Sequence, residues 1–290
     1  EFQYPRLGPG MMWEKTADRI ADNGGEVHLK SAVTRVCRDG MRVTSVDIER
    51  WDGNGTRTTE TVEGSHFVNT MALRDLVHAF DPLPPDDVVA AANLLRYRDF
   101  LIVTLVLDHA DPFPDNWIYV HSPKVKVGRI QNFRAWSAEL LPNAETASIG
   151  MEYFCQAGDG LWTMTDDDLR DLAASELEQL GLSKASTVID HFVIRQPKAY
   201  PVYDGDYKDA LDVVAGWLKR LENFQTVGRN GLHRYNNQDH SMLTAMLAAR
   251  NIMGERHDVW NVNVERSYHE EFEVSKSQTA QAAEPDRAQA

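Results

Sequence analysis

The sequence has 290 residues, of which 42% are hydrophobic and 26% charged, a globular composition that excludes disorder of the whole chain. Its 30 basic residues are outnumbered by 44 acidic ones, and the formal net charge of −14 argues against binding to nucleic acid or to anionic membranes. No apolar run approaches the roughly 20 residues that would cross a bilayer, so no transmembrane segment is expected.

The first part of the chain is predicted to combine one helix with several short strands. A turn-rich opening leads into a helix at residues 11–22, with Met12, Thr16 and Ile20 on one face and glycines at its end. The Asp-Gly-Asn-Gly sequence at residues 52–55 predicts a hairpin turn. The strands are predicted at residues 27–29, 33–36, 42–49, 58–62 and 65–70, and a further helix at 73–80.

The middle of the chain is predicted to form an antiparallel sheet, because successive strands are joined by short loops without intervening helices. The clearest helix is expected at residues 166–180, where three aspartates open the first turn and Gly181 ends it. The strands are predicted at residues 100–107, 117–120, 127–133, 148–154 and 187–195. The other elements are predicted as helices at 86–94, 207–221 and 242–252 and a strand at 224–228, with a disordered tail from 275.

Several kinds of site are not supported by the sequence. Two cysteines, Cys37 and Cys155, are too few for a disulfide framework or a zinc site, and a reducing, cytoplasmic setting is expected. The histidines lack metal-ligand spacing, so no metal is expected, and no G-x-S-x-G nucleophile motif is present. The chain starts at Glu1 without a signal sequence, and we expect it to be cut from a longer protein.

Residues 224–249 hold the densest group of candidate ligand-binding side chains. A short strand runs into Gly228 and Gly231, which permit close approach of backbone to a ligand, and a helix follows. Asp239 and Ser241 are candidate N-cap residues of that helix, whose free N–H groups attract anionic or polar atoms. An ordinary strand–loop–helix connection is the alternative, although it needs fewer polar side chains than this loop contains.

A second glycine loop, at residues 4–13, also precedes a helix, and a plain turn explains it equally well on local evidence. The order of parts carries more information. It runs from this loop and helix through Val33, the hairpin and SHFVNTMALRDL to an all-β middle and GRNG…D…S. In this order the chain resembles the amine-oxidase-type flavoproteins, whose relatives include protoporphyrinogen oxidase, phytoene desaturase and UDP-galactopyranose mutase.

The resemblance covers residues 4–254, and its most specific motifs match the mutase branch: the glycine loop followed by Trp13, the Ala-Tyr-Pro at 199–201 and the GRxG…RY…D segment. It implies an α/β (α+β) fold that combines part of a Rossmann-like FAD-binding domain with a mostly antiparallel substrate domain. The implied domains are 1–80 and 223–274 for FAD binding, 81–222 for substrate and 275–290 as tail.

The resemblance also implies FAD as cofactor. The residue matching Val33 would lie on the adenine side, although a core valine is the local alternative. The segment from Gly228 would approach the flavin and pyrophosphate, and Asp239 with the start of the next helix would hold the ribityl chain and a flavin carbonyl. The implied cofactor-binding residues are Gly8, Gly10, Val33, Gly228, Arg229, Asn230, Gly231, Asp239, Ser241 and Met242.

One departure from the family pattern is plain. The G-x-G-x-x-G turn that binds the FAD pyrophosphate in these proteins is missing from the sequence. The simplest account is that about half of a flavin site is present, so we expect this chain to be colourless when it is expressed alone.

On the substrate side, aromatic residues alternate with polar ones in the predicted sheet, which suits a ring-shaped or nucleotide-like ligand. Any single aromatic side chain is equally explained as part of a sheet core. The mutase-like motif points to Tyr200 and Tyr203, and Tyr235 matches a tyrosine that contacts substrate diphosphate. The candidate substrate-binding residues are Trp117, Tyr119, Arg129, Asn132, Tyr200, Tyr203, Arg234 and Tyr235.

Three functions remain open from the sequence. The first is an FAD-dependent oxidoreductase in which the flavin accepts a hydride from a small organic substrate, with no catalytic side chain identified. The second is a mutase-like flavoenzyme acting on a nucleotide sugar without net redox change. The third is a non-catalytic module that kept the fold. The expected partner is a small molecule, and the oligomeric state is not predicted.

Overall fold

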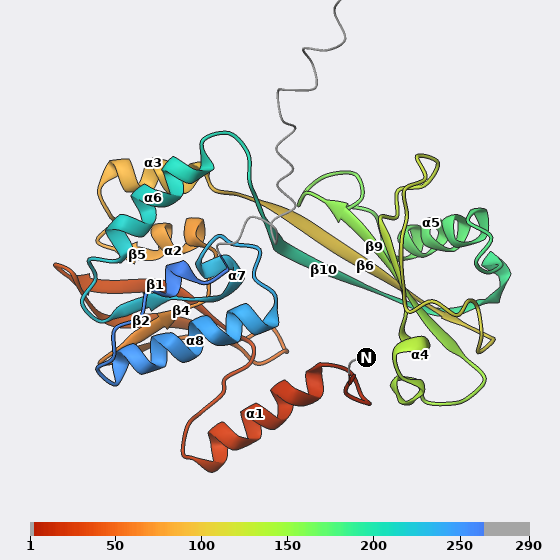
Figure 1. The fold of residues 1–290 in the computed structure, drawn as a ribbon, viewed down its shortest axis with the longest axis horizontal. Helices are drawn as coiled ribbons and strands as arrows, with labels where there is room; N and C mark the ends of the chain where they lie inside the picture. The colour runs from red at the N-terminus through yellow and green to blue at the C-terminus, as the bar shows by residue number, and fades with distance from the viewer. Residues whose placement is uncertain (1–2, 264–290) are drawn as a thin grey trace, which may run out of the picture.

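The computed structural model describes residues 3–263, which fold into two lobes joined by two long strands (Figure 1). The joining strands are β6 (Arg96–Leu107) and β10 (Val188–Val202), which pair antiparallel. The helix α1 (Gly10–Asp22) lies outside both lobes and has no buried residue.

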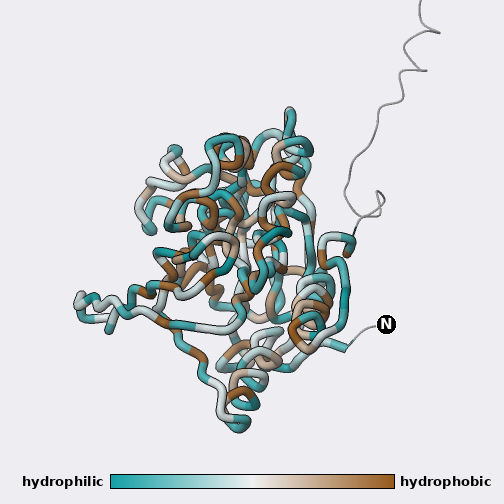
Figure 2. The backbone as a smooth tube through the Cα atoms, turned by 90° about the vertical axis from the view of Figure 1, so that its left-hand side faces the viewer, coloured by the Kyte–Doolittle hydropathy of each residue, from teal (hydrophilic) through white to brown (hydrophobic). Residues whose placement is uncertain are grey.

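The first lobe contains a four-stranded sheet in the order β3-β2-β1-β5 and a two-stranded parallel sheet of β11 and β4. Figure 2 shows hydrophobic segments gathered in the interior and hydrophilic ones on the outer loops. The strands are β1 (Ser31–Asp39), β2 (Arg42–Trp51), β3 (Arg57–Glu63), β4 (Phe67–Asn69), β5 (Phe80–Asp81) and β11 (Phe224–Thr226). The helices are α2 (Leu73–Ala79), α3 (Asp86–Leu94), α6 (Tyr207–Leu218), α7 (Gly228–Gly231) and α8 (Gln238–Ile252), followed by the 3-10 turn η3 (Val259–Asn261).

The second lobe is built on a five-stranded antiparallel sheet in the order β10-β6-β9-β8-β7, which confirms the predicted antiparallel arrangement. Its further strands are β7 (Trp117–Tyr119), β8 (Arg129–Asn132) and β9 (Ala147–Cys155). Its helices are α4 (Phe133–Trp136), η1 (Ala138–Leu140), α5 (Asp166–Gln179) and η2 (Ala185–Thr187).

The helix α5 covers one face of this sheet. Thr165 caps the helix by accepting a hydrogen bond from the backbone of Asp168, and the acidic first turn lies at the positive end of the helix dipole. Leu169 and Leu177 pack against alternate sheet residues, which are fully buried. Those sheet residues are Leu101, Val103, Leu105, Ile130, Ile149, Met151 and Tyr153.

The register of the five strands defines the opposite face, which we call the aromatic face. Residues directly opposite one another in an antiparallel sheet point to the same side, so its side chains form three rows across the strands. The first row is Trp117, Gln131, Gly150, Thr104 and Phe192; the second is Tyr119, Arg129, Glu152, Ile102 and Ile194; the third is Phe154, Phe100 and Gln196.

A bulge in β10 between Gln196 and Tyr200 lies where the two lobes meet. The Asp99 carboxylate accepts hydrogen bonds from the backbone N–H of Lys198 at 2.6 Å and of Ala157 at 2.5 Å. Lys198 has a left-handed backbone (φ 53°), a conformation that non-glycine residues adopt rarely. The carboxylate of Asp99 therefore stabilises the bulge from which Tyr200 projects.

Two predicted elements of the N-terminal part of the chain differ from the structure. The predicted strand at residues 27–29 is irregular and exposed, because it has no neighbouring strand to pair with. The predicted helix α1 forms, but its apolar face is not covered: Met12 and Ile20 are exposed in the described structure. The predicted hairpin at residues 52–55 is confirmed, since it joins the antiparallel pair β2 and β3.

Helix α8 also differs from its prediction. It begins at Gln238, four residues earlier than expected, with Asn237 at the N-cap position. Asp239 and Ser241 are therefore inside the first turn and are not its caps. In addition, the predicted loop at Gly228 to Gly231 forms the one-turn helix α7.

The predicted substrate domain, residues 81–222, includes α3 and α6, yet both helices pack in the core of the first lobe. Their apolar residues recur at helical spacing, and α2 supplies the facing surface. The lobe to which α3 and α6 belong is therefore decided by tertiary contacts and not by their position in the sequence. The predicted tail, residues 275–290, lies outside the described residues.

Candidate functional site

The glycine turn, Gly228 to Gly231, follows β11 directly and lies against the end of β4. A Cβ atom at Gly231 would lie 2.7 Å from Thr226 Oγ1 and 3.1 Å from the Asn69 carbonyl oxygen, so this position requires glycine. Gly228 has φ +80° and its N–H donates to Thr244 Oγ1 at 3.1 Å. The turn is thus held tightly between the end of the parallel strands and α8.

The first turn of α8 supplies the polar part of this region. The first N–H groups of a helix have no intrahelical partners, and no side chain caps this helix, so these groups can meet an anionic or carbonyl group. Asp239 has a largely exposed side chain in this turn, beside His240 at 3.1 Å. Ser241 and Met242 follow it. An uncapped helix start beside a glycine turn fits the flavin-facing role that the resemblance implies for these residues.

Arg229 connects the glycine turn to β10. Its Nε donates to the Asn236 carbonyl at 2.8 Å and its Nη1 to the Ala199 carbonyl at 3.2 Å. Its guanidinium lies 5.2 Å from the ring centre of Tyr200 and 4.7 Å from that of Tyr235. Asn230 makes a parallel connection, donating from Nδ2 to the Lys198 carbonyl at 3.0 Å. Arg229 also donates from Nη2 to Asn237 Oδ1 at 3.4 Å, so both side chains are held by groups of this chain, mainly by backbone carbonyl oxygens.

Arg129 is the charged centre of the aromatic face. It forms an ion pair with Glu152 at 2.5 Å, and the two side chains are only 11% and 3% exposed. Burial lowers the pKa of Arg129, but the hydrogen bond to Tyr200 and the charge of Glu152 outweigh it, and the pKa is raised overall. Arg129 is therefore a charged group neutralised inside the protein. Its guanidinium lies 4.9–5.8 Å from the ring centres of Phe100, Trp117, Phe154 and Tyr200.

Tyr200 and Tyr235 join the aromatic face to the glycine turn. Their rings stack with centres 5.6 Å apart at 14°. The Tyr200 hydroxyl accepts a hydrogen bond from Arg129 at 2.6 Å, and the Tyr203 hydroxyl accepts one from the Tyr235 backbone at 2.6 Å. Four candidate substrate residues, Arg129 among them, are thus brought together, although the first and last are 106 positions apart in sequence.

Trp117 and Tyr119 lie on the same face at its outer strand. Their rings stack at 5.9 Å and 11°, and the residues are 41% and 62% exposed. Together with Phe154 and Phe192, they form the accessible aromatic surface of the face, whereas Arg129 is enclosed.

Two candidate substrate residues serve the backbone instead. Asn132 is buried; its Nδ2 donates to the Phe113 carbonyl at 2.8 Å and its Oδ1 accepts from Ala135 at the start of α4. Arg234 donates to the carbonyl oxygens of Trp260 at 2.7 Å and Val262 at 2.8 Å, and burial lowers its pKa. Neither side chain is among those that meet at the aromatic face.

The glycines of the opening loop lie elsewhere. A Cβ atom at Gly8 would meet Leu140 at 3.3 Å, and the neighbouring Tyr4 stacks on Trp136 at 5.0 Å. The opening loop, including Gly10 at the start of α1, therefore joins the second lobe near η1, apart from the glycine turn (Figure 1). Val33 packs against the core of the first lobe. The predicted cofactor residues therefore lie in three separate parts of the fold.

His233 was not selected from the sequence, yet it lies at the centre of the junction between the lobes. It is 1% exposed and has a left-handed backbone (φ 46°), and the only polar group among the described residues that acts on its ring is the backbone of Val202, which opposes the effect of burial on its pKa. Burial lowers its pKa to about 4. Its ring lies 4.9 Å from that of Tyr97 and 6.2 Å from those of Tyr203 and Tyr207. No local pattern distinguishes this histidine from exposed ones.

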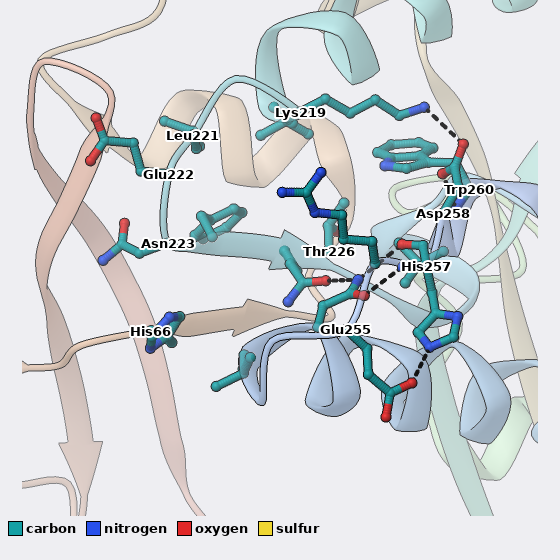
Figure 3. Close-up of a pocket in the computed structure, with 17 residues that line it drawn as sticks. His66, Lys219, Leu221, Glu222, Asn223, Thr226, Glu255, His257, Asp258 and Trp260 are labelled. Carbon is teal, nitrogen blue, oxygen red and sulfur yellow. Dashed lines mark hydrogen bonds and ion pairs between the residues drawn. The ribbon is translucent and has the colours of Figure 1, made fainter.

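A separate hollow of about 530 Å³ lies beside the start of β11 (Figure 3). Lys219 pairs with Asp258 at 3.4 Å and His257 with Glu255 at 2.6 Å along its wall. It is away from the aromatic face, and its paired charges of both signs favour no single class of ligand.

Among residues 3–263, no cluster of histidine, cysteine, aspartate or glutamate could hold a metal ion. In the same residues, no helix has the length and apolar character needed to cross a membrane.

The fold of this chain is similar to that of three solved structures, a UDP-galactopyranose mutase, a protein assigned as a protoporphyrinogen oxidase and an oxidoreductase. Reduced UDP-galactopyranose mutase superposes with a TM-score of 0.71 at 16% identity, over 88% of this chain and 54% of the mutase. At this identity the likeness establishes the fold. No family model and no curated protein sequence matches the chain.

Two other solved structures support the same fold. A protein provisionally assigned as a protoporphyrinogen oxidase from Exiguobacterium sp. 255-15 has a TM-score of 0.57 at 13% identity, over 83% of this chain and 51% of that one. An oxidoreductase from Methanosarcina mazei has a TM-score of 0.51 at 10% identity, over 83% and 54%. The chain thus spans about half the length of each structure that it matches.

Proposed function

We propose that this chain supplies the substrate-covering sheet and part of the flavin site of an FAD-dependent oxidoreductase. The observation that carries the proposal is the contact between the two parts of the site: the Tyr200–Tyr235 stack connects the aromatic face to the glycine turn and α8. A planar cofactor placed against the glycine turn would then have one side toward the sheet.

The residues present fit a flavin in specific ways. Gly231 leaves no room for a side chain, and the uncapped first turn of α8 with Asp239 offers N–H groups and a carboxylate for polar atoms of the cofactor. When bound, the flavin supplies the ring that accepts a hydride from a C–H or C–N centre. The sheet orients the substrate and excludes water, and no side chain is assigned as a general base.

The cofactor's pyrophosphate needs a phosphate-binding turn that the 290 residues do not contain. We therefore expect the chain to purify colourless when it is expressed alone. Visible flavin absorbance at one equivalent per chain would contradict this division of the site.

The proposal implies a longer protein that combines this chain with the phosphate-binding turn, and the role of Asp239 is tested in that protein once it is loaded with flavin. Asp239→Ala should weaken flavin retention about tenfold, as expected for loss of one hydrogen bond to a polar group. Trp117→Ala, on the sheet, should leave retention unchanged. A stronger effect of Trp117→Ala than of Asp239→Ala would overturn the placement of the cofactor beside α8.

A mutase acting on a nucleotide sugar is the second candidate. It is favoured by the likeness to UDP-galactopyranose mutase and by the tyrosines of the mutase-like motif. Isothermal titration of the reduced longer protein with a uridine diphosphate sugar tests it, and the absence of binding would leave the oxidoreductase.

A further inference from the structure

The aromatic face carries almost no net charge. Of its thirteen positions in three rows, only Arg129 and Glu152 are charged at neutral pH, and they neutralise each other. Gln131 donates a further hydrogen bond to Glu152. On this face, charged side chains appear only beyond the rows, with Asp190 at one end and Arg98, opposite Tyr200, at the other.

The arginines near the site already have partners. A phosphate that recruited Arg129 would have to separate it from Glu152 and leave a buried carboxylate unpaired, which is strongly unfavourable. Arg229 and Arg234 are likewise directed at backbone carbonyl oxygens. Lys198 forms an ion pair with Asp75. A diphosphate on this face would therefore meet cations that are engaged elsewhere.

The accessible side chains of the face are apolar or aromatic. Trp117 and Tyr119 stack in nearly parallel planes, and Ile194 and Phe192 are more than half exposed at the opposite edge. Gly150 lies between them and is buried, because the Phe133 ring packs over it: a Cβ atom at Gly150 would meet that ring at 3.0 Å. The exposed surface is therefore formed by the two edges of the face. Flat aromatic or conjugated molecules gain both area burial and favourable ring contacts on such a surface.

We propose that the aromatic face binds a flat, uncharged, unsaturated organic molecule as the substrate rather than a nucleotide sugar. This inference rests on the proposed function, whose substrate class it names. The uncharged rows favour a ligand that loses no ionic hydration on binding, and the exposed rings and isoleucines supply its contact surface.

A pair of fluorescent probes with the same aromatic body tests this directly on the 290-residue chain. N-phenyl-1-naphthylamine is uncharged, and 8-anilino-1-naphthalenesulfonate differs from it by an anionic sulfonate. Each probe is titrated into the chain, and the binding that is lost when Trp117 is replaced is compared. The uncharged probe should bind there about tenfold more tightly than the sulfonate. Equal or tighter binding of the sulfonate there would overturn the proposal.

Matched variants localise the binding, because other exposed apolar residues also take up such probes. Trp117→Ala should weaken binding of the uncharged probe about tenfold, whereas Trp51→Ala, an equally exposed tryptophan of the first lobe, should leave it unchanged. Glu152→Gln releases the charge of Arg129 and should strengthen sulfonate binding by about tenfold. An unchanged preference in Glu152→Gln would contradict the role assigned to the neutralised pair.

The longer flavin-loaded protein separates this inference from the proposed function. Binding of the uncharged probe there, lost in Trp117→Ala, supports both. Flavin binding together with tight, Trp117-dependent binding of a uridine diphosphate sugar overturns the substrate class alone. Probe binding without any flavin binding overturns the oxidoreductase and leaves the ligand class. Loss of probe binding in the longer protein would mean that other polypeptide covers the face, and would overturn the inference.

Discussion

Two buried glutamates lie on opposite sides of the same sheet and are stabilised in different ways. On the α5 side, Glu176 accepts hydrogen bonds from the backbone of Lys126 and Val127 and from the Tyr153 hydroxyl. On the aromatic face, Glu152 is paired with a cation, Arg129. The first arrangement fixes a loop and a helix in one place. The second neutralises the charge of Arg129 within a face whose other side chains are mainly aromatic and aliphatic.

The largest expected effect comes from separating the ion pair. Arg129→Met leaves Glu152 buried without its cation and should destabilise the protein by about 3–5 kcal/mol. Urea denaturation of the purified variant measures this loss. The double variant Arg129→Met with Glu152→Met should recover most of it, and a loss as large as in the single variant would show that packing, rather than charge, is responsible.

The two faces should also differ in their sensitivity to truncation. Leu177→Ala, in the fully buried layer under α5, should cost about 2–5 kcal/mol, because it creates a cavity. Ile194→Ala on the open face should cost about 0.5 kcal/mol or less. Thermal unfolding of both variants tests the difference, and similar losses would mean that the aromatic face is packed by other parts of the protein.

A third buried group, His233, has no charged partner among the described residues, and burial has the largest effect on its pKa. Its folded-state pKa of about 4 is below the ordinary value of 6.5, so the unfolded chain binds the proton more tightly between these values. Its contribution to stability is therefore complete above pH 6.5 and is lost as the pH falls toward 4. Between pH 7 and 5 the loss is about 2 kcal/mol.

Urea denaturation at pH 7 and pH 5 measures this loss as a difference between two proteins. His233→Asn keeps a residue that tolerates the left-handed backbone but removes the titrating ring. The variant should lose less stability than the parent between the two pH values. The same pH dependence in both proteins would show that carboxylates alone determine it.

Local sequence patterns identified much of the architecture. The hairpin at residues 52–55, helix α5 with its acidic start, and the antiparallel sheet were predictable because turn residues and apolar periodicity are local signals. The strand predicted at residues 27–29 was wrong, since an apolar pattern forms a strand only where a neighbour can pair with it. The motif resemblance identified the flavoprotein fold, which the solved structures confirm.

The composition of the candidate site was only partly predictable. The resemblance selected Tyr200 and Tyr235, and the structure places them in contact. It also selected Asn132 and Arg234, which bind backbone carbonyl groups instead. Polar residue types in a promising segment do not show which way their side chains point.

The sequence by itself determined the elements, the glycine turn and the class of fold, because these depend on backbone preferences and on the order of motifs along the chain. Only the tertiary structure decided that Arg129 is neutralised by Glu152, that α3 and α6 belong to the first lobe, and that His233 is buried at the junction. Strand register and burial, which arise from contacts between distant segments, set the charge state and accessibility of each side chain.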